Sequence, residues 1–75
     1  MNLDYVKNQR GLDFIQKGMK VQSTYNNKFG IVKGGNSSGN IDVLFDGEKV
    51  PQNCHPKWLI KYFAPDGSLI ADFGE

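Results

Sequence analysis

The sequence is poor in cysteine, in net charge and in long apolar runs, and each shortage excludes a class of protein. A single cysteine among 75 residues cannot form an internal disulfide, which argues against a disulfide-stabilised secreted scaffold and favours a reducing compartment. The formal net charge of +1 gives no long-range field that would attract the whole chain to nucleic acid or membrane. No apolar run approaches the roughly 20 residues of a membrane span, and the first residues, MNLDYVKNQR, lack the apolar region of a signal peptide. We therefore expect one cytoplasmic domain without membrane contact or cofactor.

The chain is rich in aromatic residues and glycines. Five phenylalanines, three tyrosines and one tryptophan give large side chains to bury, which compensates for an apolar fraction of only 39%. A chain of this length still buries only about 60–65% of the surface that its unfolded form exposes. We expect a small core and modest stability.

Residues 18–45 carry the clearest structural pattern. Apolar and polar side chains alternate there in three short runs, which predicts three β-strands. The polar residues 25–28 and the glycine-rich residues 34–39 separate the runs and predict two turns. Gly30 lies inside the second run, where a glycine indicates a bulge, a bend or the close approach of another backbone. A meander this short cannot cover its own apolar face, so we expect it to bend and close.

The rest of the chain supplies further strands. Asp46-Gly47 predicts a hairpin turn, followed by a fourth strand at residues 48–50 that Pro51 ends. Asn53 is expected to cap a single 3₁₀ turn that carries Trp58. Residues 60–63 form the fifth strand, and residues 68–71 pair back on it. The prediction is an all-β fold, a small SH3-like five-stranded antiparallel barrel, rather than a β-sandwich or a Rossmann-like fold.

Three segments follow from this pattern, and the first is the least regular. Residues 1–17 are expected to form a short, partly turn-like arm that packs on the barrel through apolar side chains (Tyr5, Val6, Phe14 and Ile15), with a frayed terminus as the alternative. Residues 18–63 form the barrel. Residues 64–75 form a carboxy-terminal hairpin or extension.

Two resemblances support this prediction. GMKV (18–21), GIV (30–32) and IDVLF (41–45) resemble the strand frame of SH3-like barrels of the KOW and Tudor kind. With YV (5–6), FDG (45–47), HPKW (55–58) and Tyr62, the order is similar to a group of small phage and prophage proteins of uncharacterised function. The chain departs from that group at residues 10–13, where RGLD replaces a Y-G-V step, and residues from 64 onward lie outside the resemblance. It implies a fold and a phage origin in a bacterial host cell, but no activity.

Catalytic and metal-binding interpretations have little support in the sequence. Cys54 and His55 are the only soft ligands, whereas zinc needs three or four, and sequence neighbours seldom form a nucleophile–base pair. Their structural interpretation is a small buried thiol beside an imidazole that is hydrogen-bonded at a turn. Residues 34–39 lack the Gly-Lys-Ser/Thr ending of a phosphate-binding loop. We predict neither an enzyme nor a metal site.

A binding surface is the remaining hypothesis. Small SH3-like barrels commonly bind through aromatic and polar groups in loops, and the candidates here are Lys20, Tyr25, Phe29, Lys33, Trp58, Lys61 and Tyr62. We expect protein contacts, either with another phage or host protein or with a second copy through an open edge at residues 49–51 or 68–72. The alternative is nucleic-acid binding, in which Lys20, Lys33 and Lys61 share a basic face beside aromatic rings. Against both, Trp58 and Tyr62 alternate with polar residues as core residues do.

Overall fold

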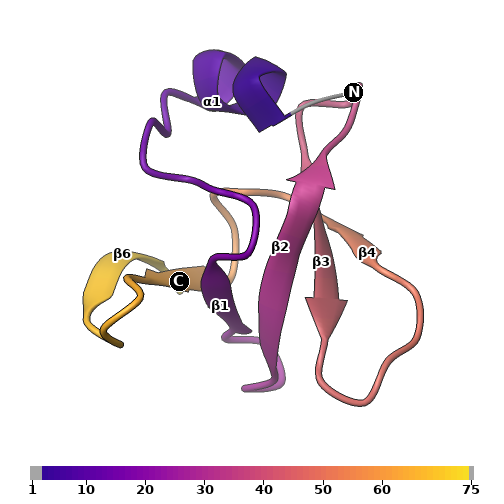
Figure 1. Ribbon diagram of the computed structural model, residues 1–75, viewed down its shortest axis with the longest axis vertical. Coiled ribbons are helices and arrows are strands. Elements are labelled where there is room, and N and C mark those ends of the chain that lie inside the picture. The colour runs from indigo at the N-terminus through magenta and orange to yellow at the C-terminus, as the bar shows by residue number, and fades with distance from the viewer. Residues whose placement is uncertain (1–2, 75) are drawn as a thin grey trace.

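The computed structural model describes residues 3–74 and is mostly β-structure with one amino-terminal helix (Figure 1). The elements in chain order are α1 (Leu3–Arg10), β1 (Lys20–Ser23), β2 (Phe29–Gly35), β3 (Ile41–Phe45), β4 (Gln52–Cys54), β5 (Ile60–Phe63) and β6 (Leu69–Phe73). All neighbouring strands are antiparallel. The expectation of an antiparallel β-fold is confirmed.

The six strands form one sheet in the order β4-β3-β2-β1-β5-β6. Strands β1 to β4 are a meander, and β5 crosses back to pair with β1 on its other side. The predicted closed barrel is wrong because the sheet is not closed, and the segment expected to pair back on the fifth strand is a sixth strand of the same sheet. Within residues 3–74, β4 and β6 are the two edges of the sheet, and they do not pair with each other.

The inner face of the bent sheet holds the core. Alternation places apolar side chains inward from β1, β2, β3 and β5, together with residues from the amino-terminal segment: Val6, Leu12, Ile15, Val21, Val32, Ile41, Val43, Phe45, Ile60 and Tyr62. Gly30 lies where the packing leaves no room for a side chain, because a Cβ there would lie only 2.7 Å from Val43 Cγ1. Of the three alternatives given for this glycine, the close approach of another backbone is present, since the same Cβ would lie 3.0 Å from Leu44 O. The bulge in β2 lies further along, between Val32 and Gly34.

The amino-terminal segment is more regular than the predicted arm. Residues 3–10 form two turns of helix, α1, which lies across one end of the bent sheet (Figure 1). Gly11, with φ of 67°, ends the helix, and the Leu12 amide donates to Lys7 O at 3.0 Å in a Schellman cap. Val6 and Ile15 are fully buried and Phe14 is partly buried against the core, whereas Tyr5 is 38% exposed.

The region after the third strand differs most from expectation. Residues 48–50 are not a strand, and β4 begins only after Pro51. Asn53 belongs to that strand and does not cap a helix, and the expected 3₁₀ turn is a single hydrogen-bonded turn in which the Trp58 amide donates to His55 O at 3.4 Å. Proline has no N–H to give to a ladder, so pairing starts on its carboxyl side.

The last strand completes the sheet at the opposite edge. Asp66 shapes the turn before β6, because its carboxylate accepts hydrogen bonds from the Ser68 amide at 2.9 Å and hydroxyl at 2.7 Å. Strand β6 pairs with β5 as expected, with a register shift near Ile70. No helix in residues 3–74 has the length and apolarity required to cross a membrane.

Candidate functional site

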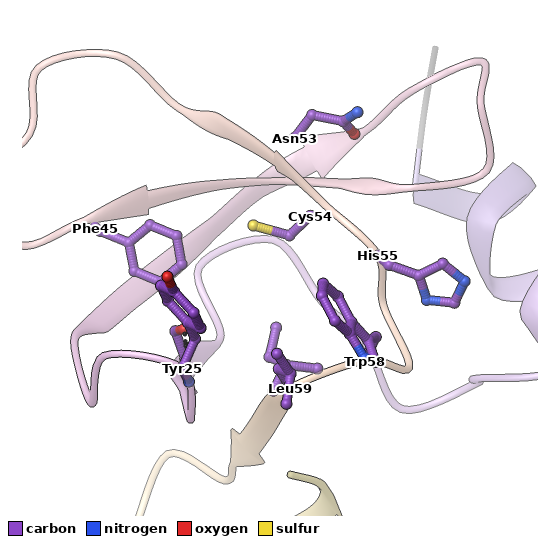
Figure 2. A pocket seen from close by; sticks show the side chains of 9 residues that line it. Tyr25, Phe45, Asn53, Cys54, His55, Trp58 and Leu59 are labelled. Carbon is purple, nitrogen blue, oxygen red and sulfur yellow. Dashed lines mark hydrogen bonds between the residues drawn. The ribbon is translucent and has the colours of Figure 1, made fainter. Parts of the chain in front are cut away.

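A pocket of about 290 Å³ lies in the gap between the two halves of the bent sheet (Figure 2). One wall comes from β3 and β4, and the other from the end of β1 and the turn leading into β5. We call it the aromatic pocket; it is lined by Ser23, Tyr25, Phe45, Asn53, Cys54, His55, Trp58, Leu59 and Ile60. It lies beside β4, an edge strand with one neighbour, β3, among residues 3–74.

Two aromatic side chains stand exposed at this pocket. Tyr25 is 82% exposed and Trp58 is 65% exposed. Tyr25 lies in the turn after β1. Its amide donates to Ser23 Oγ at 3.3 Å, and Asn27 in the same turn has φ of 62°. Exposed aromatic rings beside an apolar hollow are typical of recognition surfaces, because they add large contact area at small conformational cost.

A turn between β4 and β5 holds Trp58 in place. The Lys57 amide donates to His55 Nδ1 at 3.0 Å, so the imidazole is hydrogen-bonded at the turn as predicted. Leu59 then adopts φ of 54°, which is rare for a residue with a branched side chain. This local conformation directs the chain back into β5 while the indole stays at the surface.

The Cys54 thiol lines the pocket as a neutral group. Figure 2 shows Cys54 pointing into the space between the labelled rings and His55 pointing away from it. Burial, and then the carboxylates of Asp42 and Glu48, raise the pKa of the Cys54 thiol. A protonated thiol is a small apolar surface and a poor nucleophile, so it contributes to the pocket as lining.

Tyr62 is not available for binding, contrary to the sequence prediction. Its side chain is 0% exposed, and its hydroxyl donates to Pro56 O at 2.7 Å. Phe14 meets the ring edge-to-face with centroids 5.1 Å apart. Tyr62 therefore anchors the turn that carries Trp58 to the core, and burial raises its pKa well above the ordinary value.

The other predicted binding residues lie elsewhere, on the outer face of the sheet. Lys20 pairs with Ile31 of β2 and Phe63 of β5, and its Nζ lies 4.4 Å from the centre of the Phe29 ring. Lys61 shares this face, but Asp72 is its partner on β6. Lys33 is exposed at the bulge of β2. None of these residues lines the aromatic pocket, so the structure divides the predicted set into two surfaces and the core.

Sequence reasoning missed most of the pocket floor. Phe45 and Ile60 were predicted only as strand residues and Leu59 was given no role, and the alternation of side chains gave no sign of a hollow beside them. Nothing in the sequence indicates that the sheet stops short of closure. Among residues 3–74, no three His, Cys, Asp or Glu side chains gather in a way that could hold a metal ion.

Compared with known proteins, the chain matches no protein-family model, no curated protein and no solved structure. The resemblance to small phage proteins therefore stays a prediction.

Proposed function

We propose that this protein is a non-enzymatic binding module that makes protein contacts through the aromatic pocket. The observation that carries the proposal is the pair of exposed rings, Tyr25 and Trp58, beside a hollow with an apolar floor. Such sites bury ring area against a partner's apolar side chains, and aromatic residues are enriched where binding energy concentrates.

The fold and origin proposed from the sequence fit this role. We regard the bent sheet as an open variant of an SH3-like barrel, since β1 to β4 form a meander and β5 returns to β1. We also propose that the protein is of phage or prophage origin and acts in the cytoplasm of a bacterial host cell. The partner is then a host protein, another phage protein or a second copy of this chain.

A pull-down with two matched variants tests the proposal. Tagged wild-type protein should retain a protein partner from bacterial lysate, and Trp58→Ala should lose it. Val50→Ala removes an equally exposed apolar side chain outside the pocket lining and should retain the partner. Equal recovery by all three proteins, or recovery of nucleic acid alone, would refute the proposal.

Nucleic-acid binding is the alternative, favoured by the placement of Lys20 over the Phe29 ring on the outer face. Its weakness is charge compensation, because Lys61 lies opposite Asp72 and Lys28 pairs with Glu48 at 3.6 Å. If Lys20, Lys33 and Lys61 contact phosphates, filter binding should weaken with salt with a log–log slope of about −2 to −3. No retention at low salt would eliminate this alternative.

A further inference from the structure

The backbone of Asn53 gives the aromatic pocket a hydrogen-bonding wall. Asn53 lines the pocket, yet its side chain lies on the outer face, where Asn36 Nδ2 donates to Asn53 Oδ1 at 2.9 Å. Figure 2 shows the Asn53 side chain pointing away from the other labelled residues. Its contribution to the pocket therefore comes from the main chain of β4, which is an edge strand.

The direction of these backbone groups follows from the hydrogen bonds of β3. The Asp46 amide donates to Phe29 O at 2.9 Å, and Asn40 O accepts from the Asn36 amide at 3.0 Å. The backbone groups of Asn40 and Asp46, both even-numbered residues, therefore face β2. Successive residues of a strand direct their N–H and C=O groups to opposite sides, so Ile41 and Val43 face β4.

The same alternation determines the direction of the backbone groups in β4. Ile41 pairs with Cys54, and Val43 pairs with Gln52, so the backbone groups of Gln52 and Cys54 are directed at β3. The N–H and C=O of Asn53, which lies between them, are directed away from the sheet. One donor and one acceptor with strand geometry thus stand beside the apolar pocket.

We infer that an extended segment of a partner protein adds to the sheet beside β4, pairs with the Asn53 N–H and C=O, and places one bulky apolar side chain in the aromatic pocket. This inference rests on the proposed function and specifies its ligand. Strand addition obtains affinity from main-chain hydrogen bonds and selectivity from pockets for alternate side chains, and both elements are present here. Phe45, Leu59 and Ile60 favour an aliphatic or aromatic side chain over a charged one.

The other edge of the sheet is a poorer source of this segment. Strand β6 exposes Leu69 and Ile70, which suits an apolar pocket, but a register shift near Ile70 makes the strand irregular. Irregular edges pair poorly with added strands. Strand β6 of a second copy is therefore a poor ligand. We assign the segment to a different protein, and pairing with a second copy through β4 is an outcome of the test.

A selection of random linear peptides on the purified wild-type protein supplies the probe. The selected peptide should carry a bulky apolar residue, and N-methylation of the peptide amide that pairs with Asn53 O should weaken binding about ten-fold or more, as expected for one lost backbone hydrogen bond.

A variant of the protein tests the same pairing from the other side. Asn53→Pro should have a similar effect, because it removes the outward N–H without breaking a bond to β3. Asn53→Ala is the matched control and should bind within about two-fold of wild type.

Amide hydrogen exchange of wild-type protein gives an independent readout that needs no variant. The Asn53 amide should exchange faster than those of Gln52 and Cys54 in the free protein, and bound peptide should slow it by about ten-fold or more. The contrary result is a peptide that loses binding to Trp58→Ala, yet binds equally well when N-methylated and leaves the exchange rate of the Asn53 amide unchanged. That result would overturn strand addition while preserving the proposed function. Failure to select any peptide, or protection of Asn53 by dimerisation alone, would also overturn it.

Discussion

Tyr62 connects the core to the turn that carries Trp58, and its titration gives a prediction at the scale of one residue. Burial raises the pKa of the Tyr62 hydroxyl above its ordinary value of 10.0. The folded protein therefore holds this proton at alkaline pH values where the unfolded chain releases it. The stabilisation is complete below the unfolded pKa and is lost as pH rises toward the folded one.

Replacing this hydroxyl should uncouple stability from alkaline pH. Tyr62→Phe should lower the free energy of unfolding by about 1–2 kcal/mol at neutral pH, because the Pro56 carbonyl loses its partner. Its stability should then fall less steeply than that of wild type above about pH 10. Urea unfolding followed across this range measures both effects. Tyr25→Phe is the control, and an identical alkaline slope for Tyr62→Phe and wild type would contradict the assignment.

A second residue-scale prediction concerns the close packing at Gly30. Gly30→Ala should lower the free energy of unfolding by about 1–3 kcal/mol, because the added methyl group would lie 2.7 Å from Val43 Cγ1 and 2.9 Å from Phe45 Cδ1. Gly34→Ala, on the same strand, has open space and should be neutral or slightly stabilising. Thermal unfolding of the two variants decides the point, and equal midpoints would show that the packing at Gly30 tolerates a side chain.

At the scale of elements, Asn36 joins three parts of the sheet. Its Nδ2 donates to Asp42 Oδ1 at 3.1 Å and to Asn53, and its Oδ1 accepts from the Ser38 amide at 3.1 Å. The side chain therefore ties the tip of the β2–β3 hairpin to β4, the edge on which we place the partner segment.

A charge at this position should loosen that edge. Asn36→Asp should destabilise the fold by about 1–3 kcal/mol at neutral pH, because it removes both donors and places a carboxylate against Asp42. The loss should shrink below about pH 4, where the new carboxyl is protonated. Asn40→Asp adds the same charge beside the Arg10 guanidinium and should not destabilise. Equal losses in both variants would show that the Asn36 network contributes nothing.

Elements were predictable from the sequence where side-chain alternation and turn residues agree. Residues 60–63, for example, were predicted with their observed bounds. The start of β4 was not predictable from alternation, because QNC has no apolar period and Pro51 displaced the strand. Only a partly turn-like arm was predicted where α1 lies, because much of the helix's stability comes from packing Val6 onto the sheet.

At the scale of the whole molecule, the openness of the sheet matters most for function. In a closed barrel, β4 would pair with another strand at its free edge, and that strand would cover the space that the aromatic pocket occupies. Whether a sheet closes depends on the twist and register of all its strands together, and no short sequence motif indicates their combined effect. Tyr25 and Trp58 were therefore identified as candidates by residue type, whereas the hollow beside them became visible only with the fold.

Fluorescence of Trp58, the one tryptophan in the chain, tests the proposed binding surface most directly. In the free protein the indole is 65% exposed, so a neutral quencher such as acrylamide should reach it readily. When the captured partner or the selected peptide is added to saturation, quenching should fall several-fold and the emission should shift to shorter wavelength. A partner that binds while Trp58 stays equally quenched and unshifted would contradict binding at the aromatic pocket.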